Sequence, residues 1–309
     1  MGGSICVFGS YLVGMTMRVP RFPVAGETLK GADFGALHGG KGSNQAIACA
    51  RLGARAAFAG CVGDDGFGRA ALDLFRDEHV RADMVRVAPD VPTGVGFILV
   101  NDAGENVITL DTGACRRMTP EMARACAGDI RACDMLLLQL EIPVDASLEA
   151  ARIAKEAGVP VLLNPAPYAP LPREFFPLID ILTPNQGEAR ALLGLSPEDG
   201  SVSDECLTGR LIDLGIPSVA ITRGSSGVVL GCAGRITTHP AYRVPALDTT
   251  GAGDTFTAGL AVALTEGQSM AEAIDFAQRA AALCVTRYGV IASLPTRAEV
   301  EAFSPGRQP

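Results

Sequence analysis

A carboxylate follows directly after a glycine turn in the stretch "LDTTGAGDTFTAGLAVALTEG" (247–267). Asp254 comes after three turn residues, Gly251, Ala252 and Gly253. Glycines at the start of a helix let several backbone N–H groups point the same way, and with the helix dipole these groups attract an anion. Asp254 would repel a bound phosphate, but it could take a proton from an attacking hydroxyl while the amides stabilise charge on a transferred group. The alternative is that Thr250 or Asp254 only caps the helix.

A second glycine turn enters a predicted helix at "GGKGSNQAIACARLGA" (39–54). Gly42 stands where a Walker A loop needs Ser or Thr for its magnesium ion, so we reject that motif although the preceding Gly40 and Lys41 fit it. Lys41 and Asn44 project from the first turn of the helix, where paired polar groups suit hydrogen bonding to a polyol. An ordinary glycine-rich turn would explain the same residues.

Two further turns come directly after predicted strands. In "LTPNQGEA" (182–189), Asn185 and Glu188 lie on one side of a first helical turn, and Glu188 could hold Mg²⁺ through water. An acidic first turn that complements the helix dipole is the alternative. In "ITRGSSG" (221–227), a strand runs into a glycine turn that suits nucleotide phosphates.

The elements that must position these turns alternate along the chain between short apolar strands and amphipathic helices. The predicted strands cover 4–9, 56–60, 134–140, 159–164, 180–185 and 218–224. The predicted helices cover 41–54, 65–79, 145–157, 186–194 and about 203–215. Apolar strands between helices are typical of a parallel sheet covered on both faces. We therefore predict one α/β domain over residues 1–309, with a doubly wound, mostly parallel sheet sandwiched by helices.

Two segments without helices interrupt this alternation. In residues 11–37, apolar and polar residues roughly alternate around Pro and Gly, and residues 93–112 are predicted to be a hairpin that turns at "NDAGEN". We expect both segments to be antiparallel and to form a small β lid. Ligands bind at the carboxyl ends of the strands in an open parallel sheet, so this lid would cover a ligand.

The composition indicates a globular, cytoplasmic protein. Hydrophobic residues make up 48% and charged residues 19% of the 309 residues, which argues against disorder. The net charge of −8 argues against nucleic acid as the main partner. We see no apolar run of membrane-spanning length and no signal-peptide pattern, so no membrane is expected. The nine cysteines form no C-x-x-C pair, as expected of reduced cytoplasmic thiols.

Together these motifs resemble the PfkB carbohydrate kinases, and within them the ribokinase group. "GGKGSNQAIACARLGA" is similar to the family's first signature, "DTTGAGDTFTAGL" to its second, and "TPNQGEA" to its N-x-x-E element. The resemblance runs from about residue 4 to about residue 302. It implies a ribokinase-like fold and the transfer of the γ-phosphate of ATP to a sugar hydroxyl, expected to be a primary one.

The resemblance also implies a role for each motif. Asp254 would be the catalytic base, and the anion hole for the γ-phosphate would be formed by the amides of Gly251, Ala252 and Gly253. The sugar would be held at Gly40, Lys41, Asn44 and Glu141. The nucleotide positions would be Asn185, Thr222, Gly224 and Gly227. Glu188 would bind Mg²⁺ through water.

Two further properties come from the resemblance alone. The ribokinase group uses a potassium ion beside the anion hole, and several of its ligands contribute only backbone carbonyls. The corresponding positions are Asp248, Thr250, Cys284, Arg287, Gly289 and Ser293. Enzymes of this group often dimerise through their lid sheets, and residues 93–112 are apolar enough for a homodimer of this kind.

One stretch departs from the pattern of the group. Ribokinases carry Asn and Asp in a G-S-x-N-x-D pattern after the first strand, whereas "GSYLVGM" places Leu12 and Gly14 at these substrate-binding positions. The hydroxyls of ribose would lose hydrogen-bond partners there, so we expect ribose to be a poor substrate. Leu12 suits a deoxy position, and Gly14 leaves room for a larger group.

Three functions therefore remain open. The leading one is an ATP-dependent kinase for a pentose, a deoxy sugar or a related polyol other than ribose. The second is a nucleoside kinase of the same fold, because Leu12 and Gly14 leave space and an apolar wall for a base. The third is a non-catalytic sugar-binding or regulatory protein, against which the intact "GAGD" and N-x-x-E motifs argue.

Overall fold

A nine-stranded sheet forms the centre of the computed structural model, which describes residues 2–304 and 306. Its strands, in spatial order, are β13 (Arg235–His239), β12 (Val228–Cys232), β11 (Ser218–Thr222), β10 (Ile181–Leu182), β9 (Val161–Leu163), β8 (Met135–Leu138), β1 (Ser4–Phe8), β4 (Arg55–Gly63) and β5 (Arg81–Ala88). All neighbours from β11 to β5 pair in parallel, whereas the β11–β12 and β12–β13 pairs are antiparallel. The predicted, mostly parallel sheet is confirmed.

Helices cover both faces of this sheet, and strands such as β8 and β9 are therefore buried along their whole length. One face packs against α1 (Lys41–Arg51), α2 (Gly66–Asp77), α8 (Ala252–Thr265), α9 (Met270–Cys284) and α10 (Arg297–Ala302). The other packs against α3 (Pro120–Ala125), α4 (Ala127–Ala132), α5 (Val144–Glu156), α6 (Gln186–Leu192) and α7 (Asp204–Asp213). Short 3₁₀ turns lie at Ala114–Arg117, Arg173–Leu178, Gly224–Ser226 and Ile291–Ser293.

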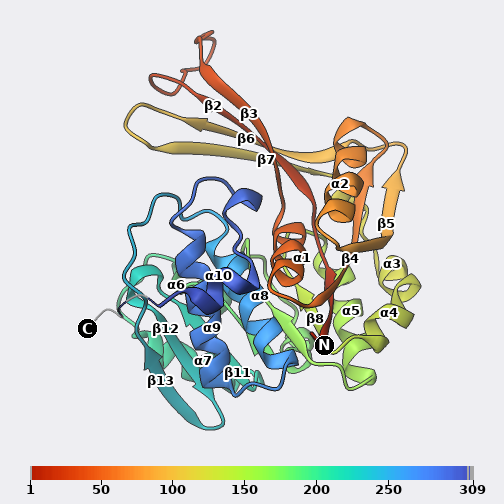
Figure 1. Cartoon of the computed structure of the whole chain (residues 1–309), viewed down its shortest axis with the longest axis vertical. Coiled ribbons are helices and arrows are strands. Elements are labelled where there is room, and N and C mark those ends of the chain that lie inside the picture. The colour runs from red at the N-terminus through yellow and green to blue at the C-terminus, as the bar shows by residue number, and fades with distance from the viewer. Residues whose placement is uncertain (1, 305, 307–309) are drawn as a thin grey trace.

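A separate four-stranded sheet forms the lid (Figure 1). Its strands, in spatial order, are β3 (Ala32–Gly39), β2 (Leu12–Arg18), β6 (Thr93–Val100) and β7 (Asn106–Gly113). Each hairpin is antiparallel as expected, but β2 pairs with β6 in parallel. The prediction of an antiparallel lid was therefore wrong, and the lid sheet is mixed. The reason is that β2 continues from β1 and β6 follows β5, so both leave the carboxyl edge of the parallel sheet in the same direction.

The carboxyl ends of the parallel strands carry the predicted motifs. Figure 1 shows the lid extending from this end of the body, while the β12–β13 hairpin lies at the far side of the sheet. Within the part of the chain that the structure describes, no helix is both long and apolar enough to cross a bilayer.

Candidate active site

Asp254 lies in the first turn of α8 and is 5% exposed. The helix is preceded by Gly251 in the left-handed conformation, with φ of 81°, so the backbone turns sharply before the first free amides. Each carboxylate oxygen of Asp254 accepts one side-chain hydrogen bond from α1. Asn44 donates its Nδ2 hydrogen to Oδ2 at 2.9 Å, and Gln45 donates its Nε2 hydrogen to Oδ1 at 3.0 Å.

The start of α1 is held by Glu141, which follows β8. Its Oε2 atom accepts a hydrogen bond from the Ser10 hydroxyl at 2.5 Å and another from the backbone N–H of Lys41 at 2.7 Å. A glycine is required at position 40, because φ is 95° and a Cβ there would lie 2.8 Å from the backbone nitrogen of Leu12. These contacts bring the predicted residues Gly40, Lys41 and Glu141 to the root of the lid, beside the Asn44–Asp254 pair.

The charges in this site are strongly coupled. The negative charge of Asp254 raises the pKa of Lys41 above its usual value, with smaller contributions from Glu141 and Glu188 that together outweigh the effect of burial. Burial raises the pKa of Glu141, against the opposing hydrogen bond from Ser10 and the charge of Lys41. Burial also raises the pKa of Glu188. Lys41 therefore supplies positive charge to a cluster of partly desolvated carboxyl groups.

Asn185 and Glu188 form a reciprocal capping box at the start of α6. Asn185 Oδ1 accepts the Glu188 N–H at 2.8 Å, and the Glu188 oxygens accept the N–H and Nδ2 hydrogens of Asn185, also at 2.8 Å. The alternative considered for these residues, an acidic residue in the first turn of a helix, is thus observed together with a capping box, and it leaves further lone pairs on Glu188 for a hydrated cation. Asn185 forms an isolated parallel bridge with Thr222, so the two predicted nucleotide motifs are adjacent.

A cavity of about 560 Å³ connects these motifs to the glycine turn at the start of α8. The predicted residues Thr222, Gly224 and Gly227 line one part of it, and Ala252 and Gly253 line another. Asn185 and Gly251 do not line it. Phe256, from the second signature, also lines it, and further lining residues come from segments without a motif: Tyr242, Gln278, Ala281, Ala282 and Val285. Three of these lie on one side of α9 at helical spacing, a pattern that sequence alone assigns to packing in the core.

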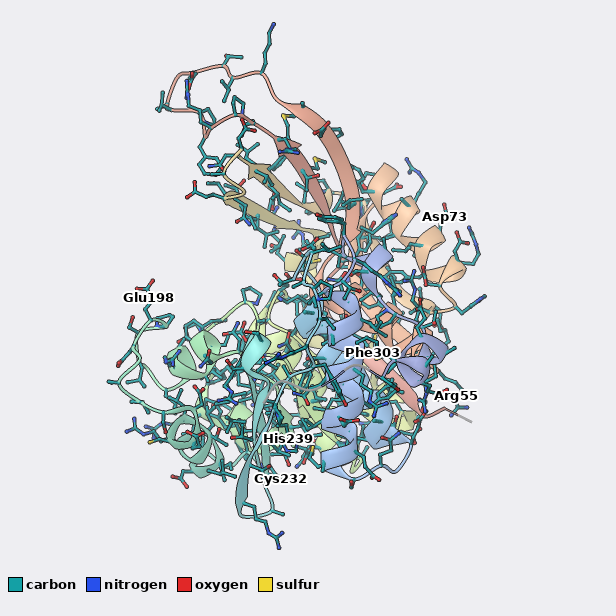
Figure 2. The ribbon with its side chains drawn as sticks, turned by 60° about the vertical axis from the view of Figure 1, so that its left-hand side comes forward. Arg55, Asp73, Glu198, Cys232, His239 and Phe303 are labelled. Carbon is teal, nitrogen blue, oxygen red and sulfur yellow. The ribbon has the colours of Figure 1, made fainter. Side chains whose placement is uncertain are left out.

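The wall of this cavity depends on a close backbone approach at Gly227. Its φ is 86°, and a Cβ there would lie 2.0 Å from the carbonyl oxygen of His239, which is labelled in Figure 2 at the end of β13. Phe303, also labelled in Figure 2, packs edge-on against Tyr242 with ring centroids 6.2 Å apart. The C-terminal segment therefore supports the cavity wall.

The predicted potassium positions form a continuous group next to Gly251. Asp248 accepts hydrogen bonds from the N–H and hydroxyl of Thr250, at 2.9 and 2.6 Å, and from the N–H of Gly289, at 3.1 Å. The Cys284 thiol lies 3.1 Å from the Ser293 hydroxyl and 3.7 Å from the Thr250 carbonyl oxygen. The Arg287 side chain points away to Glu299, at 2.7 Å, so only its backbone is available here.

Leu12 and Gly14 lie on the same face of β2. Leu12 is 5% exposed, and its Cδ2 atom occupies the space above Gly94, where a Cβ would lie only 2.3 Å away. Among the described residues, a Cβ at Gly14 would meet nothing closer than Ile98 Cδ1, at 3.6 Å. Gly14 is therefore not required by the packing of this chain, because a Cβ there would make only ordinary van der Waals contacts.

These groups can perform one reaction in particular. A buried carboxylate stands at the amino end of a helix, next to a cavity of a size that suits a nucleotide and beside polar groups that suit a polyol. Among the described residues, no group of three or more His, Cys, Asp or Glu side chains is arranged to hold a metal ion. Fold and site together define a kinase that transfers a phosphoryl group to a small hydroxyl compound.

Comparisons with known proteins identify the family. The model of the pfkB family carbohydrate kinases matches residues 3–297. The ribokinase of Haemophilus influenzae is 40% identical over 303 residues, which cover 98% of this chain and 99% of that protein. The structure of Arabidopsis thaliana ribokinase complexed with ribose and ATP superposes with a TM-score of 0.91 at 35% identity, covering 98% of this chain and 100% of that one. This chain belongs to the pfkB family of carbohydrate kinases, has the ribokinase-like fold and is an ATP-dependent phosphotransferase.

Proposed function

We propose that this kinase phosphorylates a hydroxyl, expected to be primary, of a monosaccharide or polyol, with Asp254 as the general base. The observation that carries the proposal is the position of Asp254. Its buried carboxylate accepts a hydrogen bond from Asn44, which lies one helical turn after Lys41 in α1. Asp254 also follows directly after Gly253, which lines the cavity proposed to hold the nucleotide.

The chemistry follows from that position. The acceptor hydroxyl gives its proton to Asp254 as its oxygen bonds to the γ-phosphorus, and the bond from that phosphorus to the β-phosphate oxygen breaks to release ADP. The amides at the turn formed by Gly251, Ala252 and Gly253 would stabilise charge on the transferred group. A base in position contributes roughly 10²–10⁴-fold to the rate.

Two cations are part of the proposal. Mg²⁺ would be held on the ATP phosphates and by Glu188 through water, because both Glu188 oxygens keep lone pairs after capping Asn185. Potassium would be held by Asp248 and by carbonyls of the adjacent group. Both ions would supply positive charge near the phosphates.

The identity of the acceptor rests on the lid. Relatives that are named ribokinase make ribose the reference acceptor. However, neither Leu12 nor Gly14 offers a side-chain hydrogen bond, and a Cβ at Gly14 would make only ordinary contacts. We therefore propose that a deoxy sugar, another pentose or a related polyol is a better acceptor than ribose. The absence of polar side chains at both positions makes nucleosides the second class to test.

The test is ADP release by purified protein with MgATP and potassium across ribose, deoxyribose, other pentoses, hexoses, polyols and nucleosides. The control variant is Asp254→Asn, which we expect to fold and to lose at least about 10²-fold in kcat. A best acceptor other than ribose, inactive with the variant, supports both parts. A kcat/KM highest for ribose would reject the lid argument only, and a variant within threefold of wild type would reject Asp254 as the base.

The lid also supports a proposal on assembly. Exposed apolar side chains include Phe97, at 53%, and Ile108, at 58%, and we propose that two copies associate through this sheet. Sedimentation of the wild type and of Ile108→Glu would test this, since a monomeric wild type excludes it.

A further inference from the structure

Gln45 follows directly after Asn44 in α1. Its side chain is neutral, and the reaction proposed above gives it no role. We propose that Gln45 is a positioning residue for Asp254, and that a chain of buried amides beginning at the carbonyl of Thr183 determines which atom Gln45 presents to it. The inference rests on the proposed role of Asp254 as the base.

The contacts of Gln45 are all internal to the protein. Its Nε2 atom lies 3.0 Å from Oδ1 of Asp254 and 3.3 Å from Oδ1 of Asn164. Its Oε1 atom accepts a hydrogen bond from Nε2 of Gln139 at 2.6 Å. Gln45 and Gln139 are fully buried, and Asn164 is 6% exposed. Every polar atom of the Gln45 side chain is therefore paired away from water.

The direction of this chain is set by a backbone group. The carbonyl oxygen of Thr183, just after β10, can only accept, and Asn164 donates its Nδ2 hydrogen to it at 2.9 Å. Asn164 must therefore present Oδ1 on its other side. That oxygen needs a donor, so Gln45 must present Nε2 there, and the same nitrogen reaches Asp254. If the Gln45 amide rotated by half a turn, its oxygen would face the oxygens of both Asn164 and Asp254.

Gln139 fixes the opposite end of the Gln45 amide. Its donation to Gln45 leaves its own Oε1 atom buried without a partner among the described residues, in the space that a Cβ at Gly9 would fill. An unpaired buried acceptor is unfavourable. Gln139 thus maintains the orientation of Gln45 while its own side-chain oxygen lacks a hydrogen-bond donor among the described residues.

The consequence for Asp254 is restraint of its carboxylate. Asn44 holds Oδ2 and Gln45 holds Oδ1, so the plane of the carboxylate is fixed while lone pairs remain for the acceptor hydroxyl. Neutral amides do not accept protons, so the proton taken from the acceptor stays on Asp254 during the transfer. Gln45 therefore orients the base and does not carry the proton.

The test compares Gln45→Met, which keeps length and removes the donor, with wild type on the best acceptor of the panel. We expect kcat to fall at least tenfold, KM for ATP to change less than twofold, and the acid limb of the kcat–pH profile to move to higher pH, because a donor to the carboxylate is lost. Thr208→Val is the matched control. Thr208 is fully buried in α7, and its hydroxyl bonds to the carbonyl of Asp204, so its loss should lower stability without moving kcat or the pH profile.

Gln139→Met provides a second variant that does not touch Asp254. It should lower kcat at least threefold and move the acid limb in the same direction, and it should have no further effect when combined with Gln45→Met. Should Gln45→Met fail to fold, Gln139→Met alone decides the question, and an unchanged kcat and pH profile overturns the proposal. If Gln45→Met stays within threefold of wild type while Asp254→Asn is inactive, the positioning role is wrong and the proposed base stands. If Asp254→Asn is active, both the proposed base and the positioning role of Gln45 are wrong.

Discussion

Glu141 accepts the backbone N–H of Lys41 at 2.7 Å, and the side chain of the same lysine extends into a group of carboxylates that raise its pKa. The backbone of Lys41 thus anchors the start of α1, while its side chain offsets the negative charge of the nearby carboxylates. Because its pKa lies above the ordinary value, Lys41 stays cationic through the neutral range, and its own titration does not limit activity there.

We therefore expect Lys41→Met to lower kcat/KM by about 10²-fold, the order seen when a charge-stabilising group is removed. Without the cation, the carboxyl groups of Asp254, Glu141 and Glu188 repel one another, so the acid limb of the pH–rate profile should move to higher pH. Rate profiles for wild type, Lys41→Met and Lys41→Arg check this. An unmoved acid limb in Lys41→Met would show that its charge does not act on the base.

Gly251 and Gly253 make a matched pair at the turn before and within α8. Gly251 has φ of 81°, and a Cβ there would lie 3.4 Å from Val290 Cγ1, so Gly251→Ala should lower the free energy of unfolding by about 1–2 kcal/mol. Gly253 lies inside the helix, and a Cβ there would meet no atom of the described residues within 4 Å, so Gly253→Ala should leave stability unchanged or slightly higher.

Both variants should lower kcat, for different reasons. Gly251→Ala would turn the amides of the proposed anion hole, and Gly253→Ala would add a methyl group to the wall of the proposed nucleotide cavity. Urea unfolding and steady-state rates separate these effects. Equal losses of stability in the two variants would contradict the conformational argument.

We expect the reaction rate to depend on potassium, and we expect this dependence to require the carboxylate of Asp248. Burial alone would raise the pKa of Asp248, but hydrogen bonds from Thr250 and Gly289 lower it overall, so this carboxylate is charged at neutral pH. We expect the wild type to be faster in potassium than in sodium at equal ionic strength, and Asp248→Asn to lose the difference. Equal wild-type rates in the two salts would remove the potassium proposal.

Glu299 should make stability depend on pH in the acid range. Its pKa is lowered from 4.5 to about 2, first by the Arg287 side chain and then by the backbone N–H of Thr296. A lowered pKa contributes stability above the unfolded value, and that contribution is lost as pH falls from about 4.5 towards 2.

Glu299→Gln should therefore cost less than about 1 kcal/mol at pH 7, because the ion pair is partly exposed. The difference from wild type should shrink as the pH is lowered from 5 to 3, as measured by urea midpoints. A constant difference across that range would assign the effect to the cap of α10 and not to charge.

Much of the fold could be predicted because its central strands are apolar throughout, as in β8 and β9. The strand β5 was missed because "RADMVRVA" alternates charged and apolar residues at an exposed edge of the sheet. The β12–β13 hairpin was missed because its turn uses Ala233, with φ of 50°, before Gly234, in place of an Asn-Gly pair. Alternation also predicts the lid strands but carries no information on their direction.

The site divides in a similar way. Charged residues beside glycine turns, such as Lys41 and Asp254, stand out in a sequence, because packing alone seldom explains a charged side chain next to a glycine turn. Gln45 and Gln139 do not, since a neutral amide among apolar residues indicates neither core nor chemistry. Ala281 and Val285, in and just after α9, are similarly hidden, because the wall of a nucleotide cavity and the interior of a protein have the same composition.

The parallel pairing of β2 with β6 affects how this enzyme folds. Each antiparallel hairpin pairs residues that are close in sequence, but the seam between the hairpins joins Leu12–Arg18 to Thr93–Val100, which are separated in sequence by β3, α1, β4, α2 and β5. Contacts of this sequence separation form slowly because loop-closure entropy must be overcome first. The lid sheet, which we propose binds the acceptor, should therefore be completed late during refolding, and recovery of activity should lag behind recovery of the helical circular dichroism signal.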